Sequence, residues 1–149
     1  MTIPASTVPT AKLYLLTQIT ALINDPAVLV SYDEPGPNQP DDIVMVGDVE
    51  RLVTPYNMVG SGGAGWLDED YTVEVVVSVF RGGDDARTTF ERACVLADQV
   101  VFVVRTDPSL GGAVVIAHPQ TVRYGGAWDD KHLGRLVTAT VDVRCRARI

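Results

Sequence analysis

Hydrophobic residues recur along this chain with two spacings, that of helices and that of strands. Apolar positions three and four residues apart predict helices over 9–24 and 84–105. Alternating apolar and polar positions predict strands, the clearest of them at 70–80 and 135–149. Shorter extended segments are predicted at 28–32, 43–46, 114–117 and 121–124. Residues 51–68 are glycine-rich and irregular, and they are predicted to form a long loop.

The order of these segments indicates the fold class. Most strands follow one another through loops, which favours a largely antiparallel sheet with both helices on one face. With 149 residues, 46% of them apolar, the chain is long enough to bury a core. We therefore expect a single α+β domain that spans residues 1–149.

Local signals mark the ends of both helices. Thr7 stands before Pro9 as a candidate N-cap, and the segment from Asn24 to Pro26 ends the first helix. An Asp84-Asp85 pair opens the second helix. The predicted buried positions of this second helix are Phe90, Cys94, Ala97, Val101 and Val104.

Two of the strands carry unusual side chains on their second face. In the strand at 70–80, Val76 and Phe80 lie among polar residues, opposite a face of tyrosine and valines. In the last strand, Arg144, Arg146 and Arg148 form a row of cations spaced about 7 Å apart. Apolar groups on both faces predict that the outer face is partly covered, by this chain or by another.

The net charge of −7 argues against nucleic-acid binding as the main role, because phosphate recognition depends on clustered cations. Residues 1–98 contain 15 acids and five bases, whereas residues 99–149 contain four acids and seven bases. This asymmetry suits head-to-tail pairing between copies, and it is equally compatible with a monomer that has a dipole.

The residues that could carry chemistry do not form a recognisable catalytic or metal site. The segment from Gly60 to Gly65 spells G-x-G-x-x-G, but no helix is predicted after it to receive a pyrophosphate. His118 and His132 have no histidine or thiol partner nearby in sequence, so no zinc ligand set is complete. We therefore expect no enzyme activity, no cofactor and no bound metal.

Further signals concern the cellular environment. Cys94 and Cys145 are far apart in sequence, which favours free buried thiols over a disulfide. No apolar run reaches the ~18 residues that a membrane span needs. Residues 1–10 lack the charged and apolar regions of a signal peptide. The sequence predicts folding in a cytoplasm, without a membrane partner.

The order of elements also points to a family. The helix at 9–24 leads through a strand and a proline-rich turn to the loop at 51–68, and Asp68-Glu69-Asp70-Tyr71 introduces a valine-rich strand. The second helix precedes Leu110-Gly111-Gly112 and a last strand with a charged outer face. Over nearly its full length, this pattern resembles the tail terminator proteins of bacteriophages with long, non-contractile tails.

The resemblance implies a structural virion protein of the phage neck, assembled in the host cytoplasm. Six copies would form a ring on the head-proximal end of the tail tube, stop tube polymerisation and dock the head–tail connector or stopper. DNA would pass through the lumen without specific binding. On this interpretation the candidate contacts to other subunits or partners are Trp66, Asp68, Glu69, Asp70, Val76, Phe80, Arg144, Arg146 and Arg148.

Other interpretations remain open. The chain also fits another neck component, such as a head–tail stopper or connector-completion protein, or a tail tube subunit. A rival from a different class is a small-ligand-binding or catalytic α+β domain that uses residues 51–68 as a lid. For the three arginines, the alternative to a subunit contact is a solvated face, since exposed ion pairs contribute only ~0–1 kcal/mol.

Overall fold

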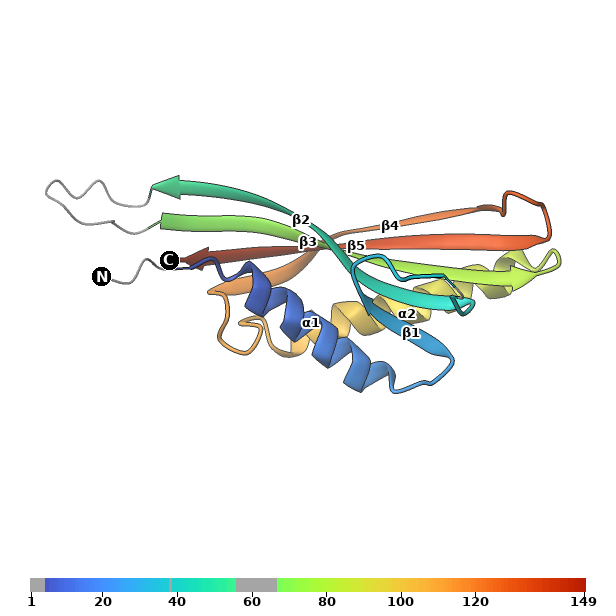
Figure 1. Ribbon diagram of the computed structural model, residues 1–149, viewed down its shortest axis with the longest axis horizontal. Coiled ribbons are helices and arrows are strands. Elements are labelled where there is room, and N and C mark those ends of the chain that lie inside the picture. The colour runs from blue at the N-terminus through green and yellow to red at the C-terminus, as the bar shows by residue number, and fades with distance from the viewer. Residues whose placement is uncertain (1–4, 38, 56–66) are drawn as a thin grey trace, which may run out of the picture.

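The computed structural model describes residues 5–37, 39–55 and 67–149 (Figure 1). These residues form two helices, α1 (Val8–Ile23) and α2 (Ala86–Thr106). They also form strands β1 (Val28–Tyr32), β2 (Asp42–Pro55), β3 (Leu67–Gly82), β4 (Ile116–Trp128) and β5 (Gly134–Arg148). The predicted α+β class is confirmed.

All five strands belong to one sheet, in the order β1-β2-β3-β5-β4. β1 runs parallel to β2, and the other neighbouring strands are antiparallel. β3 and β5 lie at the centre and pair along their length, with Val75 opposite Val141. The two strands approach so closely at Gly134 that a Cβ there would lie 2.1 Å from the carbonyl oxygen of Arg81. Only glycine fits this position.

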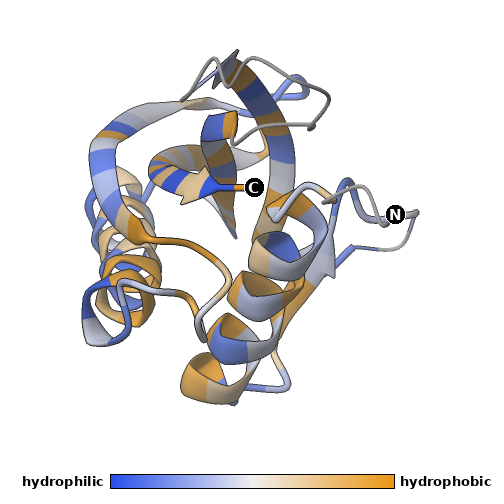
Figure 2. Ribbon diagram, turned by 90° about the vertical axis from the view of Figure 1, so that its left-hand side faces the viewer, coloured by the Kyte–Doolittle hydropathy of each residue, from blue (hydrophilic) through white to orange (hydrophobic). Residues whose placement is uncertain are grey.

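Both helices pack against the same face of the sheet (Figures 1 and 2). α2 lies over β3 and β5, and α1 lies beside α2 over β1 and β2. The inward side chains of the two central strands are fully or almost fully buried: Tyr71, Val73, Val75, Val77, Val79, Val137, Ala139, Val141, Val143, Cys145 and Ala147. The alternation seen in the sequence therefore selects the face on which the helices pack.

The predicted loop at 51–68 is wrong at both ends. Residues 51–55 continue β2, and residues 67–68 begin β3, with Arg51 opposite Tyr71 and Thr54 opposite Asp68. Residues 51–55 of β2 are exposed, with Leu52 at 64%, so this segment lacks the alternation of apolar and polar residues that a half-buried strand shows. A register shift between Val46 and Val49 marks a β-bulge that contains Gly47. Residues 56–66 lie outside the described part of the chain.

The predicted buried face of α2 is also partly wrong. Its buried side chains are Thr89, Ala93, Leu96, Ala97, Val100, Val103 and Val104. Phe90 is 42% exposed, and Cys94 and Val101 are only partly buried. The helix carries more apolar residues than one face needs, because Phe90, Val95 and Phe102 are all exposed. Periodicity alone could not tell which apolar residues face the sheet.

The two extended segments predicted around Pro119 form a single strand, β4. Its register with β5 shifts between Pro119 and Thr121, so the proline lies beside a bulge. Proline lacks a backbone N–H, and this edge strand tolerates it because its outer side has no strand partner in the described sheet. The segment at 114–115 precedes the strand.

The correction to α2 can be tested by comparing two truncations. Leu96→Ala removes a fully buried side chain and is expected to lower the free energy of unfolding by about 2–5 kcal/mol. Val95→Ala shortens a side chain that is 48% exposed, and it is expected to change the free energy of unfolding by less than about 1 kcal/mol. Urea denaturation followed by circular dichroism measures both. Equal losses for the two variants would contradict the assigned orientation of α2.

Candidate functional site

The described helices leave the opposite face of the sheet uncovered (Figure 1). Its side chains on β3 and β5 are half-buried rather than fully exposed, and they include the predicted contact residues Val76 and Phe80. Near β1 the face is bordered by residues 33–35 and Gln39. There a hollow of about 540 Å³ is lined by apolar Ile43, Met45 and Val76 among polar residues.

An arginine row, consisting of Arg144, Arg146 and Arg148, occupies this face toward the C-terminal end of β5. Arg144 lies 3.8 Å from Asp70 and Arg146 lies 3.7 Å from Asp68, while Asp68 accepts a hydrogen bond from Arg148 at 3.2 Å. The row was predicted to meet acids of another subunit, and the structure gives it acidic partners within the chain. Two carboxylates of the neighbouring strand β3, Asp68 and Asp70, thus face the arginine row.

The central part of the same face is acidic. Asp48 and Glu50 from β2, Glu74 from β3 and Asp142 from β5 line a hollow of about 450 Å³ together with Arg123 from β4. We call this set the acidic hollow. The only ion pair among these five residues joins Arg123 to Asp142 at 2.9 Å. Three of the carboxylates therefore lack an ion-pair partner among the described residues.

Glu69 was predicted to contact a partner, but its side chain is fully buried inside the chain. It accepts hydrogen bonds from Ser6 Oγ and from both the backbone N–H and the hydroxyl of Thr7, and it forms an ion pair with Arg51. Burial alone would raise the pKa of Glu69, but the hydrogen bonds from Ser6, Thr7 and Arg51 outweigh it and lower the pKa. This carboxylate fixes the start of α1 to the sheet and is unavailable to a partner.

The role of Thr7 also differs from the prediction. Thr7 is the N-cap residue of α1, but its side chain makes no cap hydrogen bond. Its hydroxyl instead bonds Glu69 and Tyr71. The glutamate replaces the usual cap, because a carboxylate at a helix N-terminus satisfies a free N–H and interacts favourably with the helix dipole. Trp66, another predicted contact, lies outside the described residues.

A second buried carboxylate, Asp42, was not among the site residues predicted from the sequence. Asp42 forms ion pairs with Arg81 of β3 and Arg92 of α2. Burial opposes ionisation, but the hydrogen bonds from both arginines prevail and lower the pKa of Asp42. These ion pairs hold α2 against the sheet. Nothing in the sequence indicated that Asp42, Arg81 and Arg92 would meet.

The groups with reactive potential lie apart from one another. Burial raises the pKa of Cys145 to about 12, so its thiol stays protonated. Both cysteines are free, and Cys94 is partly buried. Asp85 caps α2 by accepting from the N–H of Thr88 at 3.2 Å, and Asp84 pairs with Arg135. Within residues 5–37, 39–55 and 67–149, no three His, Cys, Asp or Glu side chains gather as a metal site would require.

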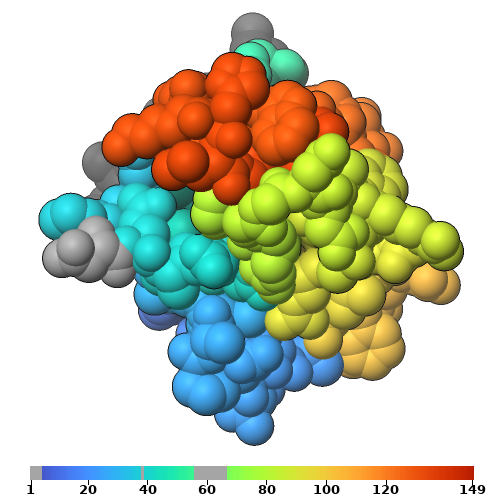
Figure 3. Space-filling view, turned by 90° about the vertical axis from the view of Figure 1, so that its right-hand side faces the viewer, coloured from blue at the N-terminus to red at the C-terminus, as the bar shows by residue number. Residues whose placement is uncertain are grey.

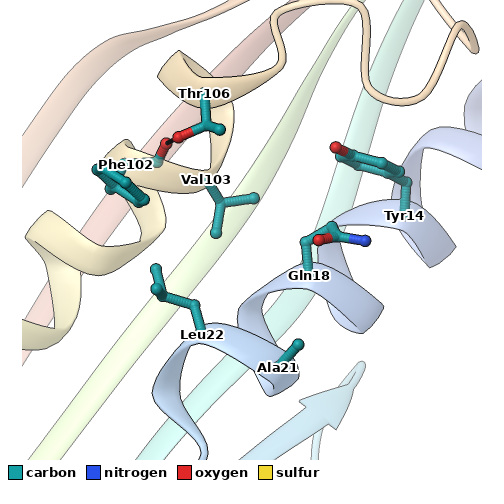
Figure 4. A pocket seen from close by; sticks show the side chains of 7 residues that line it. All are labelled: Tyr14, Gln18, Ala21, Leu22, Phe102, Val103 and Thr106. Carbon is teal, nitrogen blue, oxygen red and sulfur yellow. Dashed lines mark hydrogen bonds between the residues drawn. The ribbon is translucent and has the colours of Figure 1, made fainter.

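Between α1 and α2 lies an apolar groove of about 270 Å³ (Figure 4). Leu22 of α1 and Phe102 of α2 face it, and they are 38% and 57% exposed. At one end, the hydroxyl of Tyr14 donates to Asp107 at 3.0 Å. Sequence analysis did not predict this groove, although apolar residues outside the predicted buried faces of the two helices indicated it.

A further hollow, of about 380 Å³, is lined by the start of α2 and by the adjoining parts of β4 and β5. Figure 3 shows this end of the molecule, where the β4–β5 turn lies against the segment between β3 and α2. The N–H of Gly83 donates to the carbonyl of Leu133 at 3.0 Å and joins the two turns. The ring of Phe90 lies 5.4 Å from that of Tyr124, and the guanidinium of Arg135 lies 3.9 Å from the centre of the Trp128 ring. This end of the molecule is rich in partly exposed aromatic groups.

The chain is thus an α+β protein with helices on one sheet face and charged, partly apolar surfaces on the other. No family model and no curated protein matches it. Among solved structures it is similar to a chain of the "Virion of native gene transfer agent (GTA) particle", at 15% identity and a TM-score of 0.47. That match covers 97% of this chain and 100% of the other. A likeness this distant supports no conclusion about function. The functional argument rests instead on the surfaces of this chain.

None of the described helices is both long and apolar enough to cross a membrane.

The buried Glu69 predicts a specific acid sensitivity. Its pKa is lowered in the folded protein, so the unfolded state binds more protons as the pH falls toward about 4. The stability contributed by Glu69 is therefore full above that pH and is lost below it. Glu69→Gln should cost about 1–3 kcal/mol at pH 7 and should flatten the loss of stability below pH ~4.

Urea denaturation between pH 2.5 and 7 measures this effect. Glu34→Gln, at an exposed position, is the matched control and should reproduce the parent curve. If Glu69→Gln instead runs parallel to the parent at all pH values, the assigned carboxylate network is wrong.

Proposed function

We propose that this chain is a structural assembly protein without enzyme activity, and specifically a tail terminator. In this role six copies would form a ring that caps the head-proximal end of a tail tube and docks the head–tail connector. The observation that carries the proposal is the uncovered face of β3 and β5. It combines half-buried Val76 and Phe80 with segregated cationic and acidic zones.

The uncovered face suits contact with protein rather than with solvent alone. Helices cover one side of the sheet, and antiparallel sheets can leave the other side exposed when that side is polar. Here apolar groups interrupt the polar positions and line a hollow. Sheet edges add to this surface, since β1 and β4 each have one side without a strand partner in the described sheet. Open edges are sites at which another chain can pair.

Charge supports passage of DNA rather than its binding. Six copies would together carry about −42, which repels a polyanion inside a ring. The arginines that could contact phosphate are mostly paired with aspartates of the same chain. A ring of this composition can surround DNA without holding it, as a terminator must.

The proposal is tested by mixing the purified chain with the tail tube protein of the same particle. Tubes of fixed length, each ending in a closed sixfold ring of this chain, are expected by electron microscopy, with a matching hexamer mass by native mass spectrometry. Unlimited polymerisation of the chain alone would identify a tube subunit instead. Binding to the connector but not to tube ends would identify another neck component, and either result rejects the terminator role.

A further inference from the structure

The acidic hollow and the arginine row lie on the same sheet face but at different positions along the strands. Thr72 is opposite both Glu50 of β2 and Arg144 of β5, and the rest of the row extends from there toward the C-terminal end. Glu74 and Asp142, paired opposite one another, lie on the other side of that line. The face therefore changes from positive to negative along the strands.

The positive zone lies at an accessible end of the molecule. Figure 1 shows the ends of β2, β3 and β5 reaching past the helices. The side chains of Arg144 and Arg146 are 40% and 58% exposed despite their aspartate partners. Their separations from these carboxylates, 3.8 and 3.7 Å, are long for ion pairs. Such pairs contribute little stability and can be exchanged for other carboxylates at small cost.

Three carboxylates of the acidic hollow lack compensating charge. Asp48, Glu50 and Glu74 line the hollow without an ion-pair partner among the described residues. Their charge is opposite to that of the arginine row, so the two surfaces are complementary in charge.

We propose that the arginine row of one copy docks into the acidic hollow of a second copy. This inference rests on the proposed function, in which the chain assembles with itself, and it names the contact. A head-to-tail contact of this kind uses the row of one copy and the hollow of the next, and it leaves the pair with one free surface of each kind. Contacts of this type close into rings when the rotation between copies permits.

A second copy fits these surfaces better than a nucleic acid does. DNA would be attracted to the arginine row, but the neighbouring acidic hollow would repel it. A purely basic partner would fill the hollow and leave the arginine row unused. A chain that carries both surfaces can use its arginine row toward one neighbour and its acidic hollow toward another.

The test uses two charge reversals on the full-length chain. Glu50→Lys with Glu74→Lys inverts the hollow, and Arg144→Glu with Arg146→Glu inverts the row. Each double variant alone should lose the closed oligomer, with the concentration for half-assembly raised about a hundredfold or more. An equimolar mixture of the two variants should assemble again, because every contact in an alternating ring then joins opposite charges.

Controls separate the contact from folding and from net charge. Asp98→Lys and Arg105→Glu change exposed charges on α2, away from the sheet face, and should assemble as the parent does. Because glutamates beside Asp68 and Asp70 add repulsion within the chain, Arg144→Gln with Arg146→Gln serves as a neutral second variant. It should also weaken assembly, and circular dichroism should show the parent fold.

Mass photometry over a dilution series gives the readout. Assembly of the parent chain with loss in both variants and recovery in the mixture supports the contact. If the parent forms its ring on tail tubes and folded variants do so equally well, the contact is wrong while the proposed function stands. If the parent forms no ring with or without tubes, the proposed function fails, and the contact fails with it.

Discussion

The pairing of β3 with β5 is the constraint on which the rest of the molecule depends. Their inward positions are valine, alanine and other apolar residues that are buried almost without exception. Since successive side chains point to opposite faces, this composition commits one face to the helices and leaves the other to polar and charged groups. Two buried ion clusters, around Glu69 and Asp42, then fix α1 and α2 on that inward face. They offset the cost of burying charge with several hydrogen bonds each.

The same constraint shapes what the protein offers to others. The outward face of long strands presents rows of side chains at a regular spacing, so residues of opposite charge can occupy different stretches of it. In this sheet the arginines lie at one end and the acidic residues lie at the centre. Apolar surface is placed separately, in the groove between the helices and in the hollow beside Phe90. A protein with several distinct open surfaces is suited to a multi-component assembly, which is the role proposed above.

The sequence predicted the fold class, both helices and the two-sided nature of the central strands, because these follow from periodicity. It failed where periodicity is weak or ambiguous. The exposed end of β2 shows no alternation and was assigned to a loop together with the start of β3, and the apolar surplus of α2 hid which of its residues are buried. Of the candidate contacts, Val76, Phe80 and the arginine row do lie on the outward face. Glu69 does not, because side chains alternate along β3 and Glu69 faces inward like Tyr71. Its partners Ser6 and Thr7 are more than 60 residues away in sequence, so the sequence did not reveal the contact.

The most direct test of the account is whether the outward face becomes covered when copies assemble. Hydroxyl-radical footprinting with mass spectrometry can compare the dilute chain with its assembled form, residue by residue. The account predicts that Met45, Val76 and Phe80 lose reactivity on assembly, while buried Leu15 and Leu96 stay unreactive in both states. Unchanged reactivity of those three outward residues in a fully assembled sample would contradict it.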